Sequence, residues 1–219
     1  MTVTRAPAGK PRPRSRRGEG ETLREDLLAA TERLMIETGS ADAVSVRAIA
    51  DAVGVTPPSI YLHFPDKDSL ILAVCERHFE VFDSVIEEAG RAADDPVESL
   101  RRRGRAYVRF GLENPEPYRI LFMTRADAQQ YDVLVGAGAR AFQHLVDAVQ
   151  RCIDDGEIGP VDPVVGAVGV WTAVHGLTSL LISMPGFPWP DVEALVDHVC
   201  EIQTRGLAES VHEDQGAAP

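Results

Sequence analysis

Residues 45–64, with the sequence SVRAIADAVGVTPPSIYLHF, have the pattern of two short helices joined by a tight turn. Ser45 is a preferred N-cap residue, and Val44 and Ile49 occupy the two positions of a hydrophobic staple, so a first helix is expected to begin here. Gly54 follows that helix and adopts a positive φ at the lowest cost of any residue. The stretch therefore predicts a short helix that ends in a sharp turn.

A second helix is expected directly after the turn. Thr56 is a second potential N-cap, and Pro57 and Pro58 lack N–H groups that the first turn of a helix leaves unpaired. Residues 22–38 supply a third helix, stopped by Gly39, with an apolar stripe of Leu23, Leu27, Ala30 and Leu34. Three such helices predict a helix-turn-helix unit whose last helix leaves one face free to enter a DNA groove.

This stretch resembles the DNA-binding domain of the TetR (TetR/AcrR) family of bacterial transcriptional regulators. The likeness runs from Leu23 to Leu72 and includes both helix caps, the Gly-Val turn and the run IYLHFPDKDSL at residues 60–70. The resemblance implies an all-α chain with an N-terminal helix-turn-helix DNA-binding domain and a C-terminal helical domain for ligand binding and dimerisation. It also implies a homodimer formed through the two C-terminal helices and a double-stranded DNA operator as partner.

The resemblance assigns DNA-contacting roles to particular positions. Arg47 and Ser59 would meet base edges or nearby phosphates, and the phosphate-contacting positions are Ser45, Tyr61, His63 and Lys67. The side chains of Pro57, Pro58 and Leu62 make no hydrogen bond to a base, so they would contribute shape and contact with thymine methyl groups. Thr56 completes this set at the start of the second helix. The alternative for all of them is ordinary solvated surface.

Two later segments resemble a subgroup of the family whose C-terminal domain is called WHG. They are NPEPYRILFM at residues 114–123 and Trp171-x-x-x-His175-Gly176. Trp171 and His175 lie one helical turn apart, and they either pack in the core or line a ligand cavity. The other lining candidates are aromatic: Phe79, Phe82, Tyr107, Phe110, Tyr118, Phe122 and Phe142. Such a cavity would accept a hydrophobic or amphipathic small-molecule effector.

Charge is distributed unevenly along the chain of 219 residues. Six positive charges precede Glu19, at Arg5, Lys10, Arg12, Arg14, Arg16 and Arg17, and subtracting them from the net charge of −12 leaves −18 on the remainder. A basic arm of this composition is expected to be disordered and to reach along a groove or phosphate backbone; the alternative is a solubilising tail. The acidic remainder is expected to keep the rest of the molecule off DNA.

The composition indicates a cytoplasmic protein. No apolar run is expected to reach the length needed to cross a bilayer, so no membrane partner is expected, and the N-terminus lacks the pattern of a signal peptide. Cys75, Cys152 and Cys200 are too few and too far apart for a disulfide framework, and we expect them to be buried apolar residues. The histidines lack metal-ligand spacing, so neither a metal nor another cofactor is expected.

The organisation expected from these patterns has four parts: a disordered basic arm at residues 1–20, the helix-turn-helix domain at 21–68, a helical effector and dimerisation domain at 69–210 and a disordered tail at 211–219. Within the second domain, helices are expected at about 67–89, 96–113, 115–123, 126–152, 163–183 and 191–208.

An enzyme is the alternative from another functional class. Residues 136–141, GAGARA, match the dinucleotide-binding pattern G-x-G-x-x-A and follow a β-prone segment at 131–135, with Asp154 and Asp155 further on. A dinucleotide site needs a βαβ unit, and the surrounding pattern is helical. The sequence therefore favours a ligand-responsive regulator that is not an enzyme, with a repressor at a palindromic operator as the preferred function.

Overall fold

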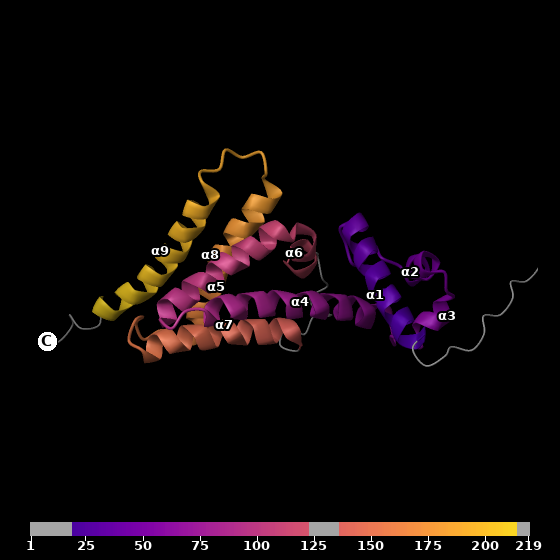
Figure 1. Cartoon of the computed structure of the whole chain (residues 1–219), viewed down its shortest axis with the longest axis horizontal. Coiled ribbons are helices and arrows are strands. Elements are labelled where there is room, and N and C mark those ends of the chain that lie inside the picture. Colours follow the sequence, from indigo (N-terminus) through magenta and orange to yellow (C-terminus); the bar gives the residue numbers. More distant parts are fainter. Residues whose placement is uncertain (1–18, 123–135, 214–219) are drawn as a thin grey trace, which may run out of the picture.

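The computed structural model describes the backbone of residues 19–122 and 136–213, which forms nine α-helices and no strand (Figure 1). The helices are α1 (Glu19–Thr38), α2 (Val46–Val53), α3 (Pro57–Ile60), α4 (Lys67–Arg91), α5 (Pro96–Glu113), α6 (Pro115–Phe122), α7 (Ala137–Asp154), α8 (Pro163–Ser183) and α9 (Val192–Glu213). Figure 1 shows α1, α2 and α3 at one end, with the long α4 running from them into the bundle of later helices. The predicted all-α fold class is confirmed.

The local chemistry of residues 45–64 determines the turn between α2 and α3. Ser45 Oγ accepts a hydrogen bond of 3.1 Å from the Ala48 N–H, which caps α2. Gly54 has a φ of 73°, a value that a residue with a Cβ rarely adopts. Thr56 stands at the N-cap position of α3, but its hydroxyl bonds Ser59 Oγ at 3.0 Å and makes no backbone cap. α3 is a single turn of four residues.

The first hydrophobic core joins α1, α2 and α3 to the N-terminal half of α4. Leu27, Ile49, Ile60 and Leu70 are each at most 1% exposed, and the staple residue Val44 is buried beside them. Ile120 of α6 also belongs to this core. Because α4 and α6 both continue into the second bundle, the helix-turn-helix unit is packed against the rest of the chain and not merely linked to it.

The second bundle contains two further cores, built from α4 to α9. Two glycines of α5 let other helices approach closely: a Cβ at Gly111 would overlap the Thr178 methyl group of α8, and one at Gly104 would lie 2.7 Å from Cys200 Sγ of α9. All three cysteines are buried, as predicted. Burial raises the pKa of Cys152 and of Cys200 to about 11, so both thiols stay protonated near neutral pH.

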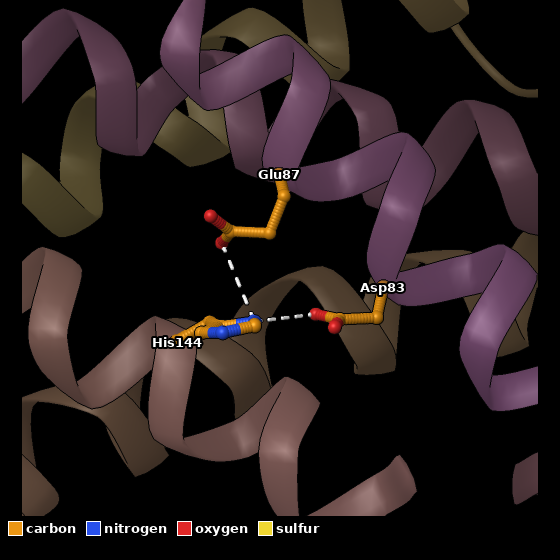
Figure 2. A group of neighbouring side chains, drawn as sticks. All are labelled: Asp83, Glu87 and His144. Carbon is orange, nitrogen blue, oxygen red and sulfur yellow. Dashed lines mark hydrogen bonds and ion pairs between the residues drawn. The ribbon is translucent and has the colours of Figure 1, made fainter.

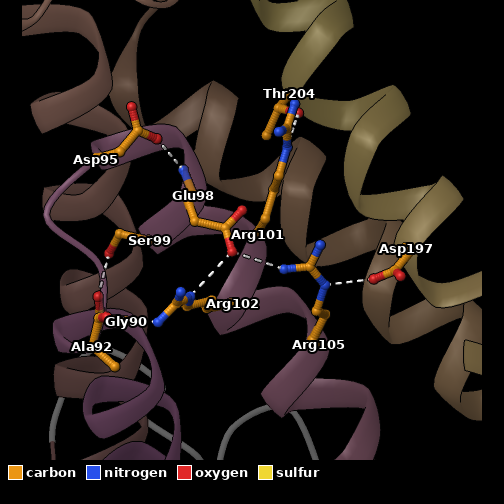
Figure 3. A network of polar contacts seen from close by, with 10 residues as sticks. All are labelled: Gly90, Ala92, Asp95, Glu98, Ser99, Arg101, Arg102, Arg105, Asp197 and Thr204. Atoms are coloured by element: carbon orange, nitrogen blue, oxygen red, sulfur yellow. Dashed lines mark hydrogen bonds and ion pairs between the residues drawn. The ribbon is translucent and has the colours of Figure 1, made fainter.

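An arginine-rich segment of α5 forms a polar network with α4 and α9 (Figure 3). Glu98 Oε1 accepts hydrogen bonds from Arg102 Nε at 3.0 Å and from Arg105 NH1 at 3.1 Å, while Arg105 Nε binds Asp197 of α9. Arg101 Nε donates to Thr204 Oγ1 at 3.1 Å. These arginines are therefore paired within the protein, and each exposed pair contributes only about 0–1 kcal/mol to stability.

Helix α8 corrects one expectation from the sequence. It is long and apolar enough, by length and composition alone, to cross a membrane, whereas no run of that length was expected. In the structure 44% of its apolar window is buried, and α8 packs against α5, α7 and α9. Ala167, Val174 and Thr178 lie in its buried face. α8 is thus a central helix of the bundle.

Three predicted boundaries also differ from the structure. α7 begins at Ala137, directly after Gly136 with a φ of 94°, whereas a helix was expected over residues 126–152; residues 123–135 lie outside the described part. α9 continues to Glu213, so residues 211–213 are helical instead of belonging to a tail. Residues 19 and 20 are helical as well, whereas 1–18 and 214–219 lie outside the described residues.

Candidate DNA-binding and effector sites

The candidate DNA-contacting side chains gather on the outer surface of α2, α3 and the turn that follows. Exposed members are Ser45, Arg47, Thr56, Pro57, Pro58, Tyr61 and Leu62, and the half-buried ones are Ser59, His63 and Lys67. The side chain of Arg47 is 88% exposed and lies 3.9 Å from Asp51, in an exposed i,i+4 pair. Such a pair is weak, so the guanidinium remains available to an external acceptor.

Leu62 is the most unusual residue of this surface. It is 84% exposed, and the neighbouring Tyr61 is 52% exposed. The flanking Ile60 and Phe64 are buried, which orients the side chains of Tyr61 and Leu62 outward. A protruding leucine and tyrosine at the end of a well-packed helical turn are typical of a surface that contacts a macromolecule. Asp66 caps α4 just beyond them, accepting from the Ser69 N–H at 2.7 Å, and this fixes the position of Lys67.

An aromatic cluster forms the centre of the second bundle. Tyr107, Tyr118, Phe82 and Phe110 are at most 6% exposed. The Phe82 ring meets Tyr107, Phe110 and Phe122 edge to face, with centroid distances of 5.2, 5.3 and 5.5 Å. Most of the predicted lining residues therefore pack against one another as core.

A chain of hydrogen bonds crosses this apolar environment. Trp171 Nε1 donates to the Tyr107 hydroxyl at 3.2 Å, the two tyrosine hydroxyls lie 3.3 Å apart, and the Tyr118 hydroxyl is 2.8 Å from His175 Nδ1. His175 Nε2 lies 3.4 Å from Ser179 Oγ. The sequence motif did not indicate Ser179, which lies one turn beyond His175 on the same helix.

Burial determines the protonation of this chain. It raises the pKa of Tyr107 and of Tyr118, so both hydroxyls stay protonated, and it lowers the pKa of His175. A neutral His175 accepts at Nδ1 from Tyr118 and carries its own proton on Nε2, facing Ser179. The whole chain is then polar but uncharged. Its members donate to and accept from one another within the aromatic core.

The outer members of the predicted set extend this cluster toward α4 and α7. Phe79 meets Phe122 at 5.6 Å, and Phe142 meets Trp171 at 6.1 Å. Trp171 is half-buried and lies 6.5 Å from Phe122, so it stands between the central cluster and α7. The structure therefore brings all nine predicted lining residues into one connected set of ring contacts.

Helix α6 links this cluster to the helix-turn-helix core. Tyr118 is fully buried in the aromatic cluster, whereas Ile120, two residues later, is 5% exposed in the core of α1, α2 and α3. One short helix thus contacts both sites. Sequence analysis did not identify Ile120, because its role depends on which core a short amphipathic helix meets.

The glycines of the dinucleotide-like motif have a packing role. A Cβ at Gly136 would lie 2.9 Å from Glu76 Oε1, and one at Gly138 would lie 3.2 Å from the Phe79 ring. They let the start of α7 approach α4. The β-prone segment 131–135 lies outside the described residues.

Comparison with known protein families gives two matches. Residues 27–74 match the model for bacterial regulatory proteins of the tetR family, and residues 100–202 match the tetracyclin repressor-like C-terminal domain. Both models describe regulators of transcription, so the chain is not an enzyme and the dinucleotide-binding alternative is wrong.

Two curated relatives come from Mycolicibacterium smegmatis. The HTH-type transcriptional activator FasR is 34% identical over 116 residues, which are 53% of this chain and 52% of FasR. The HTH-type transcriptional regulator EthR is 31% identical over 110 residues, 50% of this chain and 46% of EthR. This chain therefore spans about half the length of the curated relatives it matches.

Solved structures share the fold over most of the chain. A protein of unknown function from Rhodococcus sp. RHA1 has a TM-score of 0.72 and 25% identity, covering 90% of this chain and 100% of that one. A TetR family transcription regulator from Marinobacter aquaeolei VT8 has a TM-score of 0.68 and 24% identity, covering 87% and 97%. With a matched DNA-binding unit, a matched C-terminal domain and this common architecture, the chain belongs to the TetR family of bacterial transcriptional regulators.

Proposed function

We propose that the protein is a cytoplasmic homodimeric repressor that binds a palindromic DNA operator and is released from it by a small hydrophobic or amphipathic effector. The exposed row ending in Tyr61 and Leu62 carries the DNA-binding part of this proposal. Arg47 and Ser59 read base edges, Ser45, Tyr61, His63 and Lys67 bind phosphates, and Thr56 contacts DNA at the start of α3. Pro57, Pro58 and Leu62 fit the groove by shape and contact thymine methyl groups.

The homodimer forms through the outer faces of α8 and α9. Val165, Val168 and Leu180 of α8 are 62%, 43% and 47% exposed, and Ile202 of α9 is 50% exposed. Gly169, Gly176 and Gly206 would each place a Cβ in open space, so another helix has room to approach there. Apolar and small residues on two adjacent helices favour a twofold four-helix contact.

The effector binds at the aromatic cluster around Trp171, Tyr107, Tyr118 and His175. Its apolar body would separate aromatic rings, and a polar atom would replace the 3.3 Å contact between the two tyrosine hydroxyls. We also propose that this domain belongs to the WHG subgroup, which residues 114–123 and the Trp171-x-x-x-His175-Gly176 segment resemble. Displacement of Tyr118 would move α6, whose Ile120 packs in the helix-turn-helix core. Effector and DNA would then weaken each other's binding by the same factor.

The test is selection of DNA bound by the full chain from a random oligonucleotide pool. The proposal expects enrichment of an inverted repeat whose half-sites lie about one helical turn apart, because a twofold dimer presents two copies of α3. Transcription in vitro from a promoter carrying that repeat then tests the direction of regulation. Absence of any enriched sequence would refute operator binding, and increased transcription would replace the repressor with an activator.

A further inference from the structure

A cluster of metal-ligating side chains lies between α4 and α7, outside both sites described above (Figure 2). Asp83 and Glu87 stand one turn apart on α4 and face His144 of α7. His144 Nδ1 is 2.9 Å from Asp83 Oδ1 and 3.9 Å from Glu87 Oε1, and one ligating atom from each residue lies within 4.8 Å of the others. The three side chains are half-buried and converge on one point.

We infer that Asp83, Glu87 and His144 form a binding site for a divalent transition-metal ion of the Zn²⁺ type, bridging α4 and α7. Two ligands each about 2.1 Å from a tetrahedral ion are about 3.4 Å apart, a value that lies between the two distances from His144 Nδ1. An imidazole together with two carboxylates favours Zn²⁺ over Mg²⁺ or Ca²⁺, which prefer oxygen ligands alone. Small side-chain rotations would bring the distances from His144 Nδ1 to Asp83 Oδ1 and to Glu87 Oε1 to this common value.

The surrounding cleft provides access to this point. It has a volume of about 420 Å³ and is lined by Glu80, Asp83, Ser84, Glu87, Glu88, Arg91, Arg140 and His144. The His144 side chain is 39% exposed. An ion would therefore enter from solvent, and water would supply its fourth ligand, as in zinc sites with three protein ligands.

The buried guanidinium of Arg103 binds Glu87 from the interior of the protein, so Glu87 must bind Arg103 and the ion at the same time. The Arg103 side chain is 4% exposed, NH1 binds Glu87 Oε1, and NH2 lies 3.2 Å from Oε2. A carboxylate offers about four lone pairs, so Glu87 can accept from Arg103 and still ligate an ion on the side of His144. Ligating carboxylates commonly accept such outer hydrogen bonds, which fix their orientation. The two further acids of the cleft, Glu80 and Glu88, offset the arginine charges.

The test is titration of the full chain with Zn²⁺ by calorimetry after treatment with a chelator. The parent is expected to bind one ion per chain at this site, and Asp83→Asn and His144→Gln should each weaken that binding by at least about tenfold. His198→Gln, which changes an exposed histidine of α9, is the matched control and should bind like the parent. Equal affinity in the parent and both site variants would overturn the inference.

Co²⁺ provides a second readout that identifies the ligands. Absorption typical of a nitrogen- and oxygen-ligated tetrahedral ion should appear in the parent and disappear in Asp83→Asn. A thiolate charge-transfer band would instead assign the ion to a cysteine and overturn the inference. Circular dichroism melting tests whether His144→Gln stays folded, and if it does not, Asp83→Asn alone decides the outcome. Because the readout is metal binding, the result is independent of the proposed binding to DNA.

Discussion

Arg47 is the residue to which we assign the proposed contact with a base. Its guanidinium projects from the first turn of α2. The side chain is 88% exposed, and its ion pair with Asp51, at 3.9 Å, is weak. Such a side chain can make a bidentate contact with guanine, whereas we propose that Lys67, half-buried at the start of α4, acts as a point charge beside phosphate. Removal of Arg47 should therefore change the sequence preference, whereas removal of Lys67 should change the affinity for every DNA sequence.

We expect Arg47→Ala to weaken binding to the selected operator by about 1–3 kcal/mol and to remove base preference at one position of each half-site. Lys67→Ala should weaken binding to every sequence alike and lower the slope of log affinity against log salt by about one unit. Fluorescence anisotropy on operator and random duplexes measures both quantities. An equal loss on both duplexes for Arg47→Ala would remove that residue from the base-reading set.

His175 makes stability depend on pH. Burial lowers its pKa below the ordinary value of 6.5, so its contribution to stability is complete above about pH 6.5 and is lost as pH falls through the folded-state pKa. His175→Gln should therefore lose less Tm than the parent between pH 7.5 and pH 5.5. Some dependence will remain, because burial also lowers the pKa of His78.

Thermal melting at several pH values checks this expectation, with the exposed His198→Gln as control. That control should keep the parent's pH dependence. If His175→Gln and the parent lose equal Tm on acidification, His175 does not determine the acid sensitivity of the fold.

At the scale of elements, the close packing of α5 on α8 depends on Gly111. A Cβ there would overlap the Thr178 methyl group and lie 3.1 Å from the Tyr118 ring. We expect Gly111→Ala to destabilise the fold by about 1–3 kcal/mol, measured by urea unfolding, because the two helices would have to separate. Gly20→Ala on α1 is the helical control, since its Cβ would meet only the His63 ring at 3.8 Å, an ordinary contact, and it should be neutral or stabilising by up to about 1 kcal/mol. Equal free energies of unfolding for both variants would contradict the close contact.

Helices with chemical signals at both ends could be predicted from sequence. Ser45 and Gly54 bound α2, and Asp66 caps α4, because each makes its bond to neighbours within a few residues. The start of α7 was not predicted: a helix was expected from residue 126, whereas α7 begins at Ala137, directly after Gly136 with its positive φ. Boundaries marked by a capping side chain were therefore predictable, whereas this boundary has no capping side chain.

The candidate site residues also differ in whether a local sequence pattern could identify them. Trp171 and His175 were predicted from the Trp171-x-x-x-His175-Gly176 resemblance and the aromatic set from its residue type, and the structure brings these rings into contact. The group of Asp83, Glu87 and His144 was missed because 57 residues separate Glu87 from His144, and only the packing of α4 on α7 brings them together. The buried pair of Arg103 and Glu87 was missed because it forms between two helices, where α5 packs on α4.

At the scale of the whole molecule, the N-terminal arm carries six positive charges and the rest of the chain is acidic. We expect deletion of residues 1–17 to lower DNA affinity and its salt dependence, because six positive charges are removed. Tm should change little, since every described helix begins after this segment. Anisotropy titrations at several salt concentrations measure the effect, and an unchanged salt slope would identify the arm as a solubilising tail.

The proposed dimer determines whether two copies of α3 can contact one operator. Val168→Glu and Leu180→Glu place a charge at either end of the exposed apolar stripe of α8, and neither site is buried within one chain. Both variants should therefore keep the parent's helix content and sediment as monomers, because burying an unpaired carboxylate between subunits is costly. Affinity for the palindrome should fall toward that for an isolated half-site, since the two half-sites are then bound independently.

Val81→Glu on α4 is the matched control for this prediction. Val81 is 53% exposed, comparable with Val168 at 43% and Leu180 at 47%, but it lies on a helix outside the proposed interface. It should remain dimeric and bind the operator like the parent. Sedimentation velocity on all four proteins separates the possibilities: dimers for both α8 variants would place the subunit contact elsewhere on the molecule. Monomers from all three variants, Val81→Glu included, would mean that any added charge disrupts assembly, and the α8 face would lose its claim to be the interface.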